Sequence, residues 1–583
     1  MATFREKSRP KPLGLHRLFH WRLIFLTLFF FALLAAVVLR VFSVSIVEHR
    51  RFVLAAEQQH ELFQVLPSRR GTVYAQDKSG ALHPLAIQKT FFSVIAVPNE
   101  VEDPEGTAKI LGELLPREAA EIPQRLSKSG DPYEVLARKV DEATGERIRA
   151  LNLAGLNLVE ESRRIYPQGK LAASVLGFVT YDDGTEEGAY GIEQHYQATL
   201  AGERGFFEGE KDAGGYWVAL GKRILNPPVH GTDVVLTLDA NIQFKLEEEL
   251  DLLREKWQPE LATGIVLEPA TGKILALAAR PTYDPNAYSA EKDFSVFRIP
   301  IVDSQFELGS VFKPITMAAG INERVITAST TYGDPGVRRF GTFSVSNFDG
   351  RSYGTQTMTQ VLEKSLNTGA MFAMERVGQE RFFEYIKSFG FGEPTGIDVP
   401  GELAGNISNL SLGRDVDYAT ASFGQGIAMT PLQIAMGMAA IANDGTLMRP
   451  YIVEKLIDDS GAEEIRRPQE VRRVISPESS ETLTRMLVSA VRNGFENRAG
   501  VKGYFVAGKT GTAQIPLQGR RGYSDDVIHT FVGYAPAFQP RFLVLVELVK
   551  PRGNRFAANT LTPVIHNLAQ FMLNYYEVPP DER

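Results

Sequence analysis

A serine and a lysine stand three positions apart at the start of an apolar run, as Ser310 and Lys313. If a helix begins at Ser310, the two side chains lie one turn apart on the same face, and the amine can reach the hydroxyl. A serine hydroxyl is a poor nucleophile until a neighbouring base takes its proton, and a lysine can be that base only when its pKa is lowered. The spacing is therefore that of a serine nucleophile with a lysine as its base.

This S-x-x-K spacing is not specific by itself, because it also occurs at Ser8–Lys11 and Ser289–Lys292. The first of these pairs lies in a basic N-terminal segment, and the second lies in a polar segment without an apolar helix after it. Ser310 differs from both, because apolar residues at helical spacing follow it. We therefore take Ser310 as the nucleophile.

A second candidate segment is Ser365-Leu366-Asn367, the only S-x-N in the chain. The hydroxyl of Ser365 could relay a proton to a leaving amine, and the amide of Asn367 could hold a substrate carbonyl. Serine, asparagine and the nearby Gly369 are also common turn residues, so an ordinary turn between two helices is the alternative interpretation.

The third candidate segment is Lys509-Thr510-Gly511-Thr512, which lies within a strand pattern. The same K-[S/T]-G sequence at 78–80 and 128–130 falls in turns. Lys509 can bind a carboxylate and lower the pKa of the Lys313 amine, while Gly511 lets a substrate backbone lie against the strand. Thr510 and Thr512 are the neighbouring substrate-binding candidates, and the backbone N–H groups of Ser310 and Thr512 are predicted to form an oxyanion hole.

These three segments occur in one order, each in the secondary structure that its role requires, and this set is typical of penicillin-binding proteins and class A β-lactamases. Over nearly all its length the chain resembles a class B penicillin-binding protein. The further phrases that carry the resemblance are Arg164–Gly169 (RIYPQG), Gly191-Ile192-Glu193 with Tyr196 and Gly202, Leu236–Asp239 with Gln243, Ala421–Gln433 (ASFGQGIAMTPLQ) and Thr530–Pro536 (TFVGYAP).

The resemblance implies a peptidoglycan D,D-transpeptidase without a cofactor. Ser310 would attack the carbonyl between the two terminal D-alanines of a stem peptide, and an amine of a neighbouring stem would resolve the acyl-enzyme. β-Lactams would acylate the same serine. The implied partners are a polytopic glycosyltransferase and divisome proteins, because the division type is favoured over the elongation type. The implied catalytic residues are Ser310, Lys313, Ser365, Asn367 and Lys509.

The segment that enters the nucleophile motif departs from the family pattern. The family usually has proline before Gly-Ser, and here Leu308 stands in that place (FELGS). Because Ser310 and Lys313 are intact, we expect a local change in the loop and no loss of function.

The length of 583 residues indicates two or more domains, and the strand and helix patterns indicate an α+β or α/β scaffold. Glycine, proline and polar residues near 213–230 mark a boundary between a mixed α+β pedestal, resembling a dimerisation domain, and a transpeptidase domain. Strand patterns at both ends of the latter, with helices over much of 308–443, indicate a sheet whose edges are far apart in the sequence. The resemblance implies that this is a central antiparallel sheet flanked by helices, as in β-lactamases. The predicted divisions are 1–22, a cytoplasmic tail; 23–42, a transmembrane helix; 43–220, the pedestal; 230–575, the transpeptidase domain; and 576–583, a C-terminal tail.

The transmembrane prediction rests on the uncharged run Leu23–Leu39, which Val41 and Phe42 extend past Arg40. About 20 apolar residues span a bilayer as a helix. The basic residues before the run predict a cytoplasmic N-terminus and an extracytoplasmic catalytic domain. A cleaved signal peptide is the alternative, but this apolar run is longer than the usual signal core.

Composition excludes several other function classes. A net charge of −7 disfavours nucleic-acid binding, which needs a basic face. The absence of cysteine excludes thiol catalysis, disulfides and thiolate metal sites. No H-E-x-x-H or similar spacing predicts a metal, Gly424-Gln425-Gly426 lacks the surroundings of a phosphate-binding loop, and His529 is interpreted as a structural histidine.

Other readings of the motifs stay open as alternatives. A β-lactamase would share the three motifs, but an anchor and a large N-terminal region are not expected of it. A β-lactam sensor would need a signalling part, and a bifunctional enzyme would need a second catalytic domain. A non-catalytic scaffold is disfavoured because the five candidate catalytic residues are all present.

Overall fold

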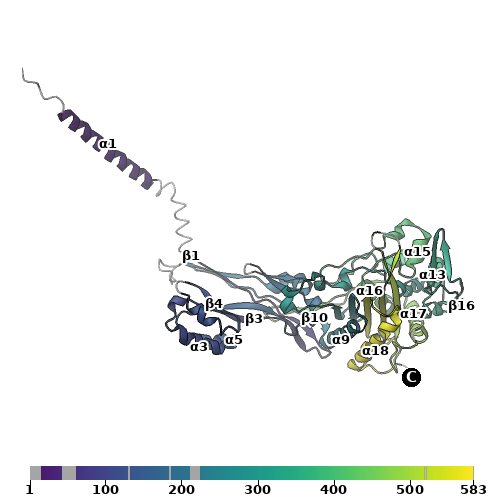
Figure 1. The fold of residues 1–583 in the computed structure, drawn as a ribbon. Helices are drawn as coiled ribbons and strands as arrows, with labels where there is room; N and C mark the ends of the chain where they lie inside the picture. Colours follow the sequence, from purple (N-terminus) through teal and green to yellow (C-terminus); the bar gives the residue numbers. More distant parts are fainter. Residues whose placement is uncertain are drawn as a thin grey trace, which may run out of the picture. The chain divides into compact units, whose positions relative to one another are not determined.

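The computed structural model describes residues 15–42, 61–128, 131–182, 185–210, 223–494, 496–517, 519 and 522–581. The chain divides into two compact units. The first comprises residues up to 68 together with 203–229, and the second comprises 69–202 and 230–583 (Figure 1).

Within the described residues, the smaller unit contains one helix and one sheet. Helix α1 (Leu15–Phe42) covers the predicted span 23–42. Among the described residues, no helix is both long and apolar enough to cross a membrane. The sheet consists of β1 (Glu61–Leu66), β8 (Gly205–Glu210) and β9 (Arg223–Asn226). The strand order is β1-β8-β9, and both neighbouring pairs are antiparallel.

In the larger unit, a seven-stranded sheet joins segments that are far apart in the chain. Strand β10 lies between β2, with which it is parallel, and β18, with which it is antiparallel. The sheet has the order β19-β18-β10-β2-β3-β4, with β5 also paired to β3. Its strands are β2 (Val73–Gln76), β3 (Leu82–Ala96), β4 (Glu134–Asp141), β5 (Leu156–Ile165), β10 (Asp233–Asp239), β18 (Val453–Ile457) and β19 (Glu463–Ile465).

Three short helices cover one end of this sheet: α3 (Pro104–Leu114), α4 (Ile122–Leu126) and α5 (Glu142–Ala150). Asp103 and Asp141 cap α3 and α5 by accepting backbone N–H groups. The charged residues of 107–155 resemble a helix over the whole segment, but β4 interrupts it. Pairing with β3 makes residues 134–141 a strand, because the apolar side chains of β4 then enter the small core beneath the helices.

A buried ion cluster forms where two of the family phrases meet. The carboxylate of Glu193 lies 2.6 Å from Arg70 and 2.6 Å from Arg164, and all three side chains are buried. Burial alone would raise the pKa of Glu193, but the two arginines outweigh it and hold the pKa below its usual value. The cluster lies beside β6 (Phe178–Asp182), β7 (Thr185–Ala189), α6 (Ala173–Leu176), α7 (Gly191–His195) and α8 (Gln197–Ala201).

A five-stranded antiparallel sheet positions the candidate site. Its order is β12-β11-β23-β22-β21, so the first hairpin pairs with the last strands of the chain, as the sequence predicted. Helices α9 and α18 pack against one face, and α16 packs against the other. The elements are α9 (Ala240–Trp257), β11 (Leu261–Leu267), β12 (Ile274–Arg280), α16 (Pro431–Ala442), β21 (Ala507–Pro516), β22 (Tyr523–Ala535), β23 (Phe542–Val549) and α18 (Ala557–Tyr575).

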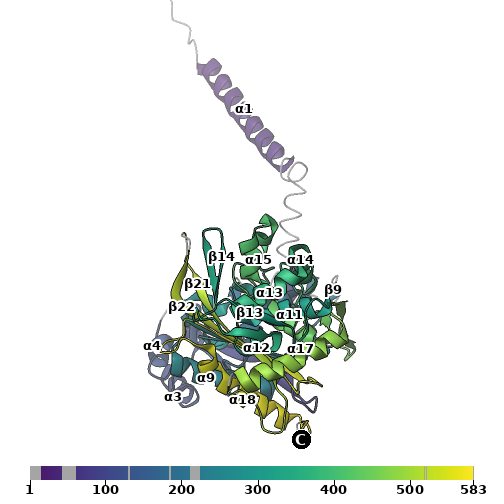
Figure 2. The same cartoon turned by 90° about the vertical axis from the view of Figure 1, so that its right-hand side faces the viewer.

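The helical part between the hairpin and the last strands carries the first two motifs (Figure 2). Its main helices are α10 (Pro300–Asp303), α11 (Lys313–Asn322), α12 (Met358–Glu363), α13 (Asn367–Val377), α14 (Gln379–Ser388), α15 (Asp415–Ala421) and α17 (Pro477–Ser489). The polar stretch 333–356 forms most of two small antiparallel pairs, β13 (Thr331–Asp334) with β16 (Gly354–Thr357) and β14 (Val337–Phe340) with β15 (Phe343–Ser346). This part also contains the strand pair β17 (Thr446–Met448) and β20 (Glu470–Arg473), the 3₁₀ turns η3 (Pro285–Ala290), η4 (Phe294–Phe297), η5 (Gly309–Phe312) and η6 (Ser408–Leu412), and the π-helical turn η7 (Ala490–Gly494). The 3₁₀ turn η2 (Pro98–Glu100) lies between β3 and α3.

Candidate active site

Ser310 and Lys313 meet because a tight turn of helix precedes α11. Ser310 lies in the 3₁₀ turn η5, and α11 begins at Lys313, three residues later than predicted. In a 3₁₀ helix, side chains at i and i+3 are eclipsed. The Nζ of Lys313 accordingly lies 3.0 Å from the Oγ of Ser310.

The same amine also contacts the second motif. The Nζ of Lys313 lies 2.5 Å from the carbonyl oxygen and 3.1 Å from the Oγ of Ser365, in the turn between α12 and α13. Ser365 has a φ of 55°, a left-handed conformation that costs a non-glycine residue roughly 1–3 kcal/mol. That conformation directs both oxygens of Ser365 toward one amine.

The surroundings of the Lys313 amine favour its neutral form. Burial, and then the charge of Lys509, lower the pKa of Lys313 well below its usual value. Burial alone lowers the pKa of Lys509 to about 7. Neither side chain is exposed to solvent. A neutral amine has two N–H groups and one lone pair, so it can donate to Ser365 while it accepts the proton of Ser310.

Asn367 is placed at the first turn of α13, with its amide already engaged. Its Nδ2 donates to the carbonyl oxygen of Ser346, at 2.8 Å. The side chain also lines the cavity beside Ser310. The third residue of the motif is therefore close to the nucleophile, and its amide N–H also ties the motif to the end of β15.

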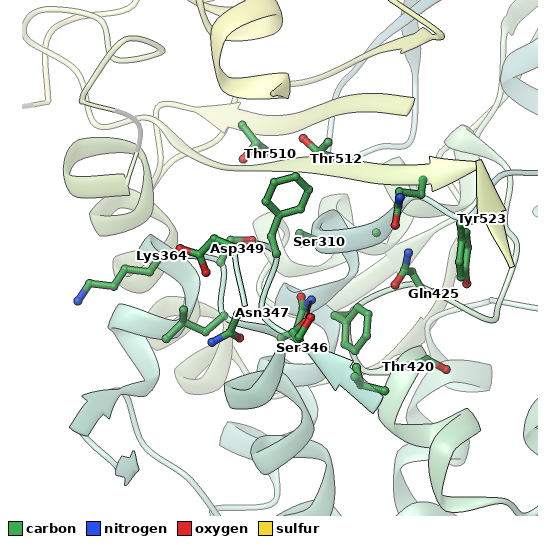
Figure 3. A pocket seen from close by; sticks show the side chains of 18 of the residues that line it. Ser310, Ser346, Asn347, Asp349, Lys364, Thr420, Gln425, Thr510, Thr512 and Tyr523 are labelled. Atoms are coloured by element: carbon green, nitrogen blue, oxygen red, sulfur yellow. Dashed lines mark hydrogen bonds between the residues drawn. The ribbon is translucent and has the colours of Figure 1, made fainter. Parts of the chain in front are cut away.

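The third motif forms the edge of the five-stranded sheet. Thr510 and Thr512 on β21 line the cavity beside Ser310 (Figure 3). The hydroxyl of Thr512 accepts the backbone N–H of Ala557, at 3.1 Å, and the Nζ of Lys509 donates to the carbonyl of Thr510, at 3.0 Å. Strand β21 therefore lies at the same cavity as Ser310.

The need for glycine at position 511 has a different cause from the predicted one. A Cβ on Gly511 would lie 2.6 Å from the carbonyl oxygen of Leu308. The segment that approaches Gly511 is thus the chain's own nucleophile loop, and a substrate backbone is not needed to explain the glycine.

Leu308 is accommodated by the packing around this loop. Its side chain is fully buried in the main core, and Gly309 follows with a φ of 63°. The N–H of Gly309 donates to the carbonyl of Gly424, at 3.0 Å. A Cβ on Gly424 would lie 2.3 Å from the carbonyl oxygen of Gly309, which explains the glycine at this place in the ASFGQG phrase.

These residues surround a cavity of ≈ 690 Å³. Of the predicted site residues, Ser310, Ser365, Asn367, Thr510 and Thr512 line it, whereas Lys313, Lys509 and Gly511 lie behind its surface. Figure 3 shows Ser310 between the strand that carries Thr510 and Thr512 and the segment that carries Ser346 and Asn347. Residues of all three motifs therefore lie around one cavity.

Much of the cavity wall was not singled out from the sequence. Phe348 and Phe556 come from segments far apart in the chain. Their rings pack edge to face, with 5.3 Å between the ring centroids. No local pattern marks either residue. Further wall residues that the motifs did not indicate are Asn347, Asp349, Tyr353, Tyr523 and Arg555.

His529 is buried on β22, and its Nδ1 lies 2.9 Å from the Oγ1 of Thr560. Burial lowers its pKa to about 4, so the ring is neutral at physiological pH. It does not line the cavity. Within the described ranges, no group of three or more histidine, aspartate or glutamate residues could hold a metal ion.

Comparison with known families gives two matches that cover most of the chain. Residues 262–570 match the penicillin binding protein transpeptidase domain, and residues 65–236 match the penicillin-binding protein dimerisation domain. The first match contains every residue proposed above for catalysis or substrate binding.

Curated relatives agree with the family matches. The chain is 33% identical to "Stage V sporulation protein D" of Bacillus subtilis, over 86% of this chain and 78% of that one. It is 30% identical to "Probable peptidoglycan D,D-transpeptidase PenA" of Neisseria meningitidis, over 89% and 86%. It is 26% identical to "Peptidoglycan D,D-transpeptidase FtsI" of Buchnera aphidicola, over 100% and 99%.

Solved structures show the same fold. Penicillin binding protein 2X of Streptococcus thermophilus superimposes with a TM-score of 0.77 at 22% identity, covering 88% of this chain and 80% of that chain. Penicillin binding protein 3 of Mycobacterium tuberculosis, complexed with aztreonam, has a TM-score of 0.68 at 28% identity, covering 89% and 98%. With its dimerisation and transpeptidase domains, the chain belongs to the class B penicillin-binding proteins.

Proposed function

We propose that the chain is a serine D,D-transpeptidase that cross-links peptidoglycan stem peptides in septal wall synthesis and that β-lactams acylate at Ser310. One observation carries the proposal: the amine of Lys313 lies 3.0 Å from the hydroxyl of Ser310 and 3.1 Å from that of Ser365. A single neutral base thus connects a nucleophile with a second hydroxyl. The transpeptidase names of two relatives support the substrate.

In the acylation half, Lys313 takes the proton of Ser310 as its Oγ attacks the carbonyl between the two terminal D-alanines. The resulting oxyanion accepts hydrogen bonds from the backbone N–H groups of Ser310 and Thr512. Loss of one such donor typically lowers the rate by roughly 10²–10³. When the C–N bond breaks, the departing amine takes a proton from Ser365, which Lys313 replaces. D-Alanine leaves, and the peptide remains as an ester on Ser310.

In the deacylation half, the same groups work in reverse. An amine of a neighbouring stem attacks the ester and gives its proton through Ser365 to Lys313. Ser310 leaves as the alkoxide and regains its proton from Lys313. The products are the cross-linked peptide and the free enzyme. Because no external oxidant, metal or cofactor enters the balance, the chain's own residues suffice.

Substrate binding is assigned to the edge strand β21. Thr510, Gly511 and Thr512 would hold the donor peptide along the strand, and Lys509 would attract its terminal carboxylate. Asn367 would hold a substrate amide on the opposite side of the cavity. The burial of Lys509 directly behind Thr510 supports an electrostatic role, because its charge acts in a poorly screened interior.

The domain plan and location are proposed as predicted from the sequence. Residues 43–220 would be the pedestal and 230–575 the transpeptidase domain, and 23–42 would anchor the chain in the cytoplasmic membrane with the catalytic domain outside. The uncharged run of α1 supports the anchor, since its side chains from 25 to 39 are exposed and largely apolar. A polytopic glycosyltransferase and divisome proteins are the proposed partners.

Division is favoured over elongation because a relative aligned over the whole chain is named FtsI. This preference is tested by depleting the protein in its own cells. Filaments that fail to divide would support a septal role. Rounded cells that lose their rod shape would instead assign it to elongation.

The catalytic assignment is tested by intact-protein mass spectrometry after incubation with penicillin. The wild type should gain the mass of one penicillin, and Ser310→Ala should gain none. A wild type without an adduct, or an equal adduct on Ser310→Ala, would sink the assignment. Loss of the adduct within seconds would favour a β-lactamase, while a missing adduct on folded protein would favour a scaffold.

A further inference from the structure

A buried carboxylate outside the three motifs lies directly behind the second one. Asp334 ends β13 and is only 4% exposed. Its two oxygens accept hydrogen bonds from Gly336 N (3.0 Å), Tyr353 N (2.9 Å), Asn347 Nδ2 (3.0 Å to each oxygen) and Thr368 Oγ1 (2.5 Å). All of these donors are neutral. A buried charge is normally paired with a cation, so this arrangement calls for an explanation.

Asn347 connects this carboxylate to the helix that carries the second motif. Its side chain is 2% exposed, and its Oδ1 accepts the backbone N–H of Thr368, at 3.2 Å. Thr368 follows Asn367 in the first turn of α13. The side chain of Thr368 is also held by the hydroxyl of Tyr332, at 3.2 Å. Asp334 and Asn347 therefore fix the start of α13 from two directions.

A second contact ties the same segment to the motif itself. Ser346 precedes Asn347 and accepts the Nδ2 of Asn367, at 2.8 Å. Ser346 and Asn347 both line the cavity, as Figure 3 shows. The segment that Asp334 holds is thus in contact with Asn367 on one side and with the cavity on the other.

The consequence for Ser365 follows from its backbone. Ser365 lies two residues before the start of α13. Its left-handed φ of 55° is unfavourable unless the surrounding structure imposes it. The bonds of Thr368 and Asn367 are among the contacts that fix the helix start after this turn. If they are lost, the turn can relax, and the two oxygens of Ser365 move away from Lys313.

We propose that Asp334 is a positioning residue for acyl transfer, which holds Asn347 and Thr368 so that Ser365 and Asn367 keep their places around Lys313. This inference rests on the proposed function, because it assigns Asp334 a role through Ser365. Asp334 touches no substrate. Its ionised carboxylate suits the position because every group that faces it is a donor, whereas an amide would present two N–H groups to other N–H groups.

The test measures penicillin acylation by rapid quench and intact mass over a range of drug concentrations. The rate constant at saturation reports the geometry of the folded protein, and the amplitude reports how much protein is folded. The variants are Asp334→Asn, Thr368→Val and Thr368→Ser. The matched control is Asp398→Asn, because Asp398 is also buried and accepts the N–H groups of Ile452 and Val453, away from the cavity.

We expect Asp334→Asn and Thr368→Val to lower the saturating rate constant roughly 10- to 100-fold, since a shift of about 1 Å in catalytic geometry can cost about 10² in rate. Thr368→Ser keeps the hydroxyl and should stay within about threefold of wild type. Asp398→Asn should lower the unfolding temperature without changing the rate constant.

A reduced amplitude with an unchanged rate constant in Asp334→Asn would overturn the proposal and leave Asp334 a stabilising residue only. If Asp334→Asn does not fold, the Thr368→Val and Thr368→Ser pair decides, and equal rate constants for the two would also overturn it. Failure of the proposed function is seen separately, because the wild type would then form no adduct at all.

Discussion

The charge of Lys509 helps to hold the amine of Lys313 in its neutral form. Both side chains are fully buried, and burial is the larger cause of the lowered pKa of Lys313, with Lys509 as the second. Two amines that are buried side by side disfavour each other's charged form, and this lowers the pKa of the one that acts as the base. Lys509 itself has a pKa of about 7, close to physiological pH.

The first prediction concerns the pH dependence of acylation. Acylation needs neutral Lys313, so its rate should rise with pH through the pKa of that amine. Lys509→Met removes the second cause of the lowered pKa and should move this rise to higher pH, whereas Lys509→Arg keeps the charge and should leave it in place. Penicillin acylation rates measured over pH 5–9 check this. A rise at the same pH in Lys509→Met would contradict it.

The second prediction concerns the base itself. Lys313→Met fills the buried space with an apolar chain but removes the amine, and should slow acylation by about 10²–10⁴. Its unfolding temperature should be equal to or above that of the wild type, because a buried amine is lost. Lys273→Met removes a lysine that pairs with Glu454 at 2.6 Å, away from the cavity, and should not change the rate. A Lys313→Met rate within threefold of wild type would exclude the assigned role.

The third prediction concerns a contact that holds the nucleophile loop. The hydroxyl of Tyr523 donates to the carboxylate of Glu307, at 2.9 Å, three residues before Ser310. A hydrogen bond to a charged group contributes about 1.5–3 kcal/mol, so Tyr523→Phe should loosen the loop and slow acylation several-fold. Tyr283→Phe, which removes a buried bond to Ala173 at 2.9 Å, is the matched control and should affect stability alone. Acylation kinetics and thermal unfolding of both variants separate the two effects.

The fourth prediction concerns stability. Glu547 is fully buried on β23, and burial raises its pKa to about 8, while its unfolded value is 4.5. The folded protein therefore keeps a proton that the unfolded chain has lost, and stability is full below pH 4.5 and declines up to pH 8. The slope is roughly 1.4 kcal/mol per pH unit at most.

Glu547→Gln removes this titration, so its unfolding temperature should fall less than that of the wild type between pH 5 and pH 8. The two proteins should be most alike below pH 4.5, where Glu547 is protonated in both the folded and the unfolded state. Thermal unfolding at several pH values checks the difference. Parallel curves for the two proteins would show that Glu547 does not titrate in this range.

The sequence predicted those parts of the fold that leave local periodic patterns. The hairpin β11–β12, the strand β10 and the final strands were recognised because alternation and turn residues are local signals. β4 was not recognised, because its charged residues resemble a helix until it pairs with β3. Pairing between distant segments overrides local preference and leaves no trace in a short window.

The residues of the candidate site also fall into those that short sequence motifs predict and those that only the folded chain reveals. Ser310, Ser365 and Lys509 stand in short motifs, so their residue types and order could be read directly. Asp334 and Asn347 could not, because their function depends on a contact with Thr368 that joins separate segments. Only the folded chain brings these residues together.

Strand β10 is hydrogen-bonded to β2 on one side and to β18 on the other. The boundary that the sequence suggests near 213–230 therefore does not mark a cassette that can be exchanged between relatives. A chimera joined there would pair strands from two parents, and any mismatch would leave an open edge that favours aggregation. Exchange should succeed only when β2, β10 and β18 come from the same parent, so these strands would be inherited as one recombination unit.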